Sequence, residues 1–148
     1  MVSFRTVCDI FDEIRAAYSS DPTRLRAIDF YTLAQSYPVG SREYCDVFEK
    51  AVEIYPDDQG CNLNAANIEM RRGEYDKAQS HLLKAGNTPH ATFARGVLAA
   101  RRADYREARS LFEKAREAGI PQAQTYLDKI SDIQNHSAVT VTVPLTKK

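Results

Sequence analysis

The sequence lacks an excess of charge of either sign. Its 148 residues include 20 basic and 20 acidic side chains, so the formal net charge is zero. Proteins that bind nucleic acid or anionic lipid through long-range attraction carry a basic excess. The balance therefore predicts no nucleic-acid partner.

Long apolar runs are also missing. No segment approaches the roughly 20 apolar residues that a helix needs to cross a bilayer, so we expect no membrane insertion. The first fifteen residues lack the basic, apolar and small-residue parts of a secretory signal peptide. We therefore expect a cytoplasmic protein, unless the chain is a fragment of a longer one.

Cysteine is scarce, and its spacing is uninformative for metal or disulfide chemistry. Cys8, Cys45 and Cys61 are odd in number and form no C-x-x-C pair. A disulfide framework or a zinc site built from cysteines is therefore not expected. We predict three buried, reduced thiols that pack as small apolar groups.

Catalytic and cofactor motifs are absent as well. His81, His90 and His136 show no metal-ligand spacing, and no glycine-rich loop follows a strand. We predict no metal, no cofactor and no enzymatic activity. A Cys–His nucleophile pair stays open as a remote alternative, because such pairs form in space and not in sequence.

What the sequence does contain is a repeat. Residues 71–85 (RRGEYDKAQSHLLKA) and residues 101–115 (RRADYREARSLFEKA) share 7 of 15 aligned positions at an offset of 30. Self-similarity at such a period is typical of stacked-repeat proteins, in which each unit packs on its neighbour. The repeat therefore predicts a scaffold that presents a surface. The paired positions are Tyr75 with Tyr105, Ala78 with Ala108, Leu82 with Phe112, and Ala85 with Ala115.

Apolar periodicity predicts a chain of helices. We expect eight helices. The first six lie at about 3–18, 22–36, between Ser41 and Pro56, 59–72, 74–85 and 89–102, the seventh follows and ends at 118, and the eighth begins at Pro121. In the second helix Leu25, Ile28, Leu33 and either Tyr31 or Phe30 are available to pack.

Local signals mark where several of these helices begin and end. Asp21 followed by Pro22 favours the start of the second helix, Ser41 caps the third, and Thr88 followed by Pro89 opens the sixth. Gly86 is placed to take the left-handed conformation after the fifth helix. Ala51 lies 34 residues before Ala85, whereas the next repeat spacing is 30 residues. Four residues make about one helical turn, so this difference predicts that the fifth helix is one turn short.

From Ser137 the pattern changes. Val139, Val141 and Val143 alternate with threonines, a two-residue period typical of an extended strand. A lone strand has no ladder partner in a helical chain, so we predict an extended or disordered tail. Pairing with another copy, which would give a homodimer through the tail, and lying along a groove of this chain are the alternatives.

The repeat resembles the tetratricopeptide repeat family. Small residues in the first helix, an aromatic after the turn and two alanines in the second helix carry the resemblance. Ala103 departs from it, because it stands where the turn glycine is expected. A weaker third unit precedes, with Phe48, Ala51 and Pro56. The matching residues are Ala65, Ala66, Gly73, Tyr75, Ala78, Leu82 and Ala85, then Gly96, Tyr105, Ala108, Phe112 and Ala115.

This resemblance implies an all-α fold, a right-handed stack of antiparallel helix pairs (a solenoid, or α-α superhelix) closed by a C-terminal capping helix. The expected divisions are an N-terminal helix (1–20), a divergent pair (21–58), two repeats (59–88 and 89–119), a capping helix (120–135) and the tail (136–148).

A narrower resemblance covers about residues 20–132. The phrases AQSYPVGSREYCDVFEKAVEIYPDD, CNLNAAN and AGNTPHATFARGVLAARRADY are similar to the C-terminal helical region of OmpA-like cell-envelope proteins of Bacteroidetes. This similarity implies a periplasmic or cell-envelope setting if the chain belongs to a longer protein.

In the tetratricopeptide family the first helix of each pair lines a concave, peptide-binding face. We therefore expect a protein or peptide partner. Asn64 and Asn67 would hydrogen-bond a bound main chain through their amides, or else the asparagines of this stretch, Asn62 included, satisfy local backbone near Pro56. The implied binding positions are Leu63, Asn64, Asn67, Met70 and Arg71, then His90, Phe93, Val97 and Arg101.

The sequence thus predicts a non-enzymatic protein–protein interaction scaffold. Two alternatives accompany it: a structural spacer or dimerisation module that uses the tail strand, and the remote Cys/His enzyme.

Overall fold

The structure is a computed structural model that describes the backbone of residues 6–146 and the side chains of residues 6–136. Within this range every regular element is a helix and no strand occurs, which confirms the all-α prediction. None of the described helices has the length and apolar character needed to cross a membrane. The chain divides into two compact units, Met1–Ala85 and Gly86–Lys148.

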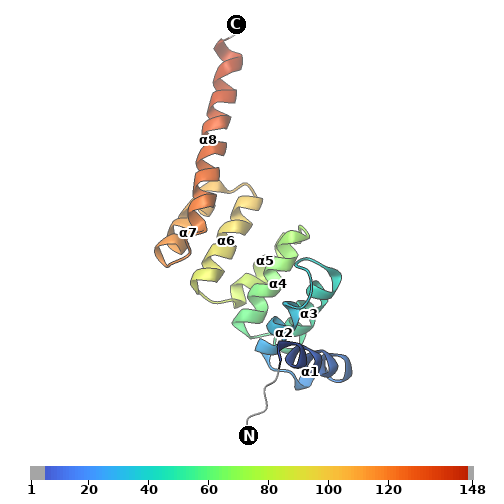
Figure 1. The fold of residues 1–148 in the computed structure, drawn as a ribbon. Coiled ribbons are helices and arrows are strands. Elements are labelled where there is room, and N and C mark those ends of the chain that lie inside the picture. The colour runs from blue at the N-terminus through green and yellow to red at the C-terminus, as the bar shows by residue number, and fades with distance from the viewer. Residues whose placement is uncertain (1–5, 147–148) are drawn as a thin grey trace. The chain divides into compact units, whose positions relative to one another are not determined.

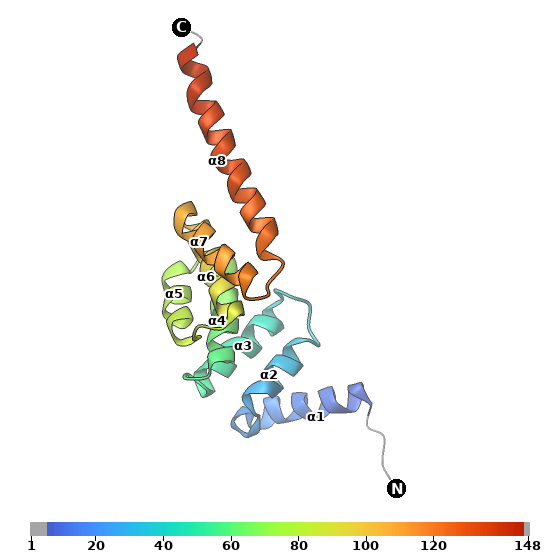
Figure 2. The same cartoon turned by 90° about the vertical axis from the view of Figure 1, so that its left-hand side faces the viewer.

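Unit 1 is a succession of helices in which each packs on the next (Figures 1 and 2). Its last two helices are joined by a tight turn at residues 72–74 and lie antiparallel. The elements are α1 (Val7–Ser20), a short 3-10 turn η1 (Pro22–Arg24), α2 (Ala27–Ala34), α3 (Arg42–Ile54), α4 (Gln59–Arg71) and α5 (Tyr75–Lys84).

Unit 2 contains three helices, α6 (Pro89–Arg101), α7 (Tyr105–Glu117) and α8 (Ala123–Thr146). α6 packs against α7, and α7 packs against the first part of α8. The rest of α8 continues beyond the amino end of α7, as both views show (Figures 1 and 2).

Most of the predicted start and stop signals act as expected. The hydroxyl of Ser41 accepts from the Tyr44 amide at 3.2 Å, and that of Thr88 accepts from the Ala91 amide at 3.2 Å. Gly86 has a φ of 78°, in the left-handed region. α5 has 10 residues and α7 has 13, a difference of about one turn. The prediction that the fifth helix is short is therefore confirmed.

The start of the second helix was predicted wrongly. The carboxylate of Asp21 accepts from the amide and the hydroxyl of Thr23, and so caps only the turn η1. The chain is extended at Leu25. α2 then begins at Ala27 because the Asp29 carboxylate accepts from the Arg26 amide at 2.9 Å and closes the first turn.

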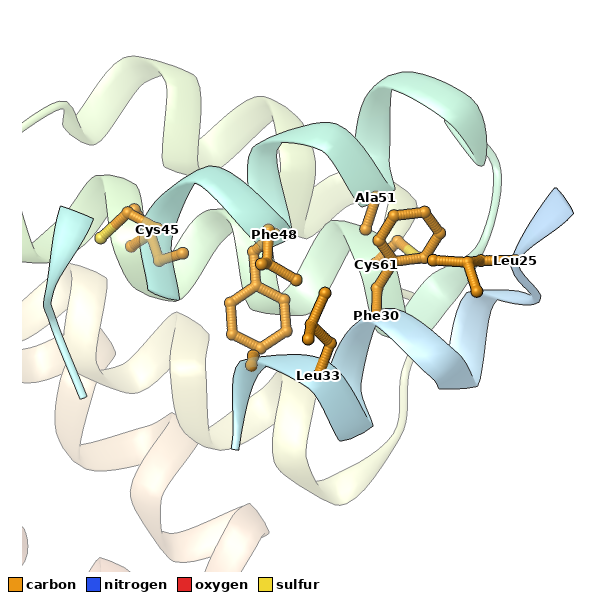
Figure 3. Packing of buried hydrophobic residues seen from close by; sticks show 10 residues of the cluster. Leu25, Phe30, Leu33, Cys45, Phe48, Ala51 and Cys61 are labelled. Atoms are coloured by element: carbon orange, nitrogen blue, oxygen red, sulfur yellow. The ribbon is translucent and has the colours of Figure 1, made fainter. Parts of the chain in front are cut away.

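The core face of α2 also differs from part of the expectation. Phe30 is fully buried, whereas Ile28 is 57% exposed and Tyr31 is 49% exposed. Phe30 lies edge-on between the rings of Tyr18 and Tyr55, with centroids 6.2 Å from each. Figure 3 shows the apolar cluster that α2, α3 and the start of α4 form around it.

The extended tail is not observed. The backbone of α8 stays helical to Thr146, so the two-residue period of residues 139–143 does not give a strand there. A helix satisfies its backbone donors and acceptors within itself, whereas a single strand leaves them unpaired. The remaining two residues of the predicted tail lie outside the described range.

In the core of unit 2, α6 and α7 approach each other closely at one point. A Cβ added at Gly96 of α6 would lie 2.8 Å from Cε1 of Phe112 in α7. The Phe112 ring also packs edge-on against Phe93 at 5.5 Å and stacks on Tyr126 at 4.9 Å. Glycine is therefore required at residue 96, because the ring occupies the space of its side chain.

Candidate binding groove

The binding residues predicted on α4 differ in their exposure to solvent. Asn67 and Arg71 are exposed, and Leu63 and Asn64 are partly buried. Met70 is only 3% exposed, so its assignment to a binding surface was wrong. It lies four residues after the buried Ala66, which puts it on the packed face of the helix.

The residues predicted on α6 belong to unit 2. His90 and Arg101 are exposed, at the two ends of the helix. Phe93 and Val97 are partly buried and pack against the core of unit 2. Phe93 contacts the Tyr126 ring at 5.3 Å as well as Phe112, so its main role is packing between helices.

Unit 1 contains an open cavity of about 500 Å³, which we call the α2–α4 groove. One wall comes from α2, the floor from α3, and the other wall from the first turns of α4. The residues that line it are Ala27, Ile28, Phe30, Tyr31, Phe48, Ala51, Asp58, Gly60, Cys61 and Asn64.

The α2 wall presents two large apolar side chains to solvent. Ile28 and Tyr31 are three residues apart and therefore lie on one face of the helix. The Tyr31 ring lies 6.5 Å from the ring of Phe48 on the floor. Ile28 was predicted to pack in the core, with Tyr31 or Phe30 beside it, because apolar periodicity does not distinguish two adjacent faces of a short helix.

The α4 wall ends in a carboxylate. Asp58 caps α4, and its Oδ2 accepts from the Cys61 amide at 2.8 Å. Burial raises the pKa of the Cys61 thiol to about 12, and a hydrogen bond to Asp58 and the charge of that carboxylate add to the shift. The thiol is thus protonated at neutral pH and is a poor nucleophile.

The other cysteines differ in exposure. Cys45 is buried like Cys61, but Cys8 is exposed, contrary to the prediction that all three are buried. Cys8 is the second residue of α1, and the apolar side chains of this helix are at most partly buried. Among the described residues, no group of three or more His, Cys, Asp or Glu side chains could hold a metal ion.

The clustered asparagines separate into two roles. Asn62 is fully buried, and its amide nitrogen donates to the carbonyls of Pro56 at 2.9 Å and Asp58 at 2.8 Å. It therefore holds the loop before α4, as the structural alternative for this residue predicted. Asn64 lines the groove, and its side chain makes no hydrogen bond within the described part of the chain.

Arg71 lies on the same face of α4 as Asn64, at the carboxyl end of the helix. A Cβ added at Gly40 would be 3.2 Å from Nη1 of Arg71, so the guanidinium lies beside the turn that follows α2. Gly40 has a φ of 83°. This contact gives Arg71 a structural neighbour within unit 1.

Comparison with known proteins adds no identification. No protein-family model matches this chain, and no curated protein is similar to it at a significant level.

Proposed function

We propose that the protein is a non-enzymatic interaction module that binds a segment of another protein in the α2–α4 groove. The observation that carries the proposal is the exposure of Ile28 and Tyr31 over an open apolar cavity. Exposed apolar side chains that rim a cavity are typical of binding sites, in contrast to single apolar residues scattered over a surface.

The free amide of Asn64 supports a peptide as the ligand. It offers one acceptor and two donors, which suits the alternating carbonyl and N–H groups of an extended main chain. A groove of about 500 Å³ is near the lower end of the range for ligand sites. It has room for one or two side chains of a peptide.

We further propose that the helix pairs stack as tetratricopeptide-like repeats. Three features support this architecture: the 30-residue period, the packing of α4 on α5, and the packing of α6 on α7. In such a stack α2 and α4 would be the first helices of neighbouring pairs. The groove between them would then belong to the face on which repeats of this kind bind their ligands.

The setting of this interaction follows from the narrower resemblance alone. We propose a cell-envelope assembly if the chain is part of a longer protein, and a cytoplasmic partner otherwise.

A random-peptide display library tests the proposed function. The library is enriched on the wild-type protein, and the selected pool is then offered to an Ile28→Ser, Tyr31→Ala double variant. We expect retention of the pool to fall at least tenfold, because truncation of central apolar contacts removes most of the binding energy of a small interface.

Leu83→Ser is the matched control. Leu83 is 76% exposed on α5 and does not line the groove, so its loss should leave retention unchanged. Circular dichroism and thermal melting check that all variants fold. A library that gives no enrichment, or a pool that the double variant retains, would contradict the proposal.

A further inference from the structure

The α2–α4 groove has an asymmetric charge. Asp58 is the one carboxylate among the residues that line it, and none of those residues is a lysine, arginine or histidine. Asp57, the preceding residue, is exposed and adds a second negative charge close by. The amino end of α4 offsets about half a charge through its dipole, so this end of the groove stays net negative.

The Asp58 carboxylate has capacity left for a ligand. A carboxylate offers about four acceptor positions, and the Cys61 amide and thiol occupy only part of them. Asp58 is half-buried, which weakens the screening of its charge by solvent.

Gly60 keeps the space around this carboxylate open. It lines the groove in the first turn of α4, and a Cβ added there would lie 3.3 Å from Oδ2 of Asp58. A side chain at residue 60 would therefore crowd the carboxylate.

The apolar and acidic parts of the groove lie side by side. Ile28, Tyr31 and Phe48 offer apolar surface, and Asp58 closes the same cavity. The complementary ligand carries an apolar group and a cation at neighbouring positions, because an apolar group alone would leave the carboxylate partly desolvated and unpaired. A carboxylate-bearing ligand would be repelled.

We propose that the groove selects a peptide segment in which a bulky apolar residue stands next to a lysine or an arginine. The apolar side chain lies against Ile28 and Tyr31, the cation pairs with Asp58, and the Asn64 amide bonds the main chain between them. This inference rests on the proposed function, and it specifies the chemistry of the partner.

Three synthetic peptides test it. Each is an eight-residue Gly/Ser chain with one phenylalanine, followed by lysine, serine or glutamate. Amide shifts of the ¹⁵N-labelled full-length protein are followed during titration, which detects millimolar affinities. We expect the Phe-Lys peptide to bind roughly two- to fivefold more tightly than the Phe-Ser peptide, the range for a partly exposed ion pair. The Phe-Glu peptide should bind most weakly.

Asp58→Asn is the decisive variant. Asparagine caps helices as well as aspartate does, so the substitution removes the charge and keeps the cap. The preference for lysine over serine should disappear, whereas Asp57→Asn should retain most of it. Added salt should reduce the preference of the wild type, because it screens exposed charges.

The outcomes separate the two proposals. If the Phe-Ser and Phe-Lys peptides bind equally, or if Asp58→Asn retains the preference, the inference is wrong and the groove is simply apolar. If no peptide shifts the amides of α2 and α4, the inference is also wrong. The library selection then decides independently whether the groove binds peptides at all.

Discussion

The α4–α5 pair of unit 1 and the α6–α7 pair of unit 2 follow one sequence pattern but pack different side chains at equivalent positions. Where unit 1 has the buried Ala66 and Leu82, unit 2 has Gly96 and Phe112. The larger ring in unit 2 requires the smaller residue opposite, since the Cβ of an alanine there would meet it at 2.8 Å. The repeat thus conserves the volume between its helices, and not the residues that fill it.

The two helix pairs also differ in a polar contact between their helices. In unit 1 Nδ1 of His81 lies 2.6 Å from Oε1 of Glu69, so a hydrogen bond joins α4 to α5. The equivalent residues of unit 2 are Leu111 and Ala99, and both belong to its apolar cluster. One pair therefore uses a half-buried polar contact where the other uses apolar packing.

Exchange of the packing residues gives the largest expected effect. Gly96→Ala should destabilise the protein by about 2 kcal/mol, because overpacking of up to about 3 kcal/mol outweighs a gain of about 1 kcal/mol in helix propensity. Urea unfolding measures the change. Addition of Phe112→Leu recreates the residues of unit 1, and we expect the double variant to recover at least half of the loss. A double variant that is no more stable than Gly96→Ala alone would contradict volume compensation.

Removal of the Asn62 side chain should cost about 1–2 kcal/mol in the free energy of unfolding. The residue loses two hydrogen bonds to backbone carbonyls, each with a net value of about 1 kcal/mol. Thr92 is the equivalent residue of α6, and Thr92→Ala serves as the control in the same urea experiment. The control should change stability by less than half as much. Equal losses would mean that Asn62 has no special role in the loop before α4.

The turns between the paired helices give an effect of about 1 kcal/mol or less. Gly73 has a φ of 78°, and Ala103, its equivalent in unit 2, has a φ of 60°. Gly73→Ala should destabilise by about 1 kcal/mol, and Ala103→Gly should stabilise by about 0.5 kcal/mol, because alanine is strained in this region. Apart from Gly73 itself and its two chain neighbours, nothing lies within 4 Å of a Cβ added there, so the backbone conformation decides the result. Thermal melting should show opposite shifts; shifts of the same sign would exclude this explanation.

The polar contact should give the smallest effect. The double variant Glu69→Ala, His81→Leu places the unit 2 residues at these two positions of unit 1. It should change the free energy of unfolding by less than about 1 kcal/mol, as for other partly exposed pairs. The single His81→Leu variant should cost more than the double, because it leaves Glu69 without this partner. A double-mutant cycle in urea measures the coupling. A double variant that loses more than both singles together would show that apolar packing cannot replace the contact.

The helix boundaries were largely predictable because they depend on local chemistry. Ser41, Thr88 and Gly86 act within a few residues of their own position, through side-chain caps and a left-handed φ. Asp21 misled the prediction because a good capping residue also stabilises a short 3-10 turn, and the extended Leu25 interrupts the helix after it.

The candidate site was less predictable. Asn64 was predicted on the binding face of α4 and lines the groove, but Ile28 was predicted to pack, Tyr31 was one of two candidates for packing, and Met70 was predicted at the surface. Each of these errors concerns the face of a helix. A shift of one residue rotates the side chain by about 100°, and the neighbouring helices decide which direction is buried.

The sequence by itself determined the helical class, the 30-residue period, the turn residues and the short fifth helix. These follow from periodicity and from backbone preferences that act over a few residues. The tertiary structure alone decided that Phe30 points inward and Tyr31 outward, that Asn62 and Asn64 differ in role, and that Asp58 faces an apolar cavity. Those outcomes depend on side chains brought together from distant parts of the chain, because burial is a property of the packed helices and not of any one of them.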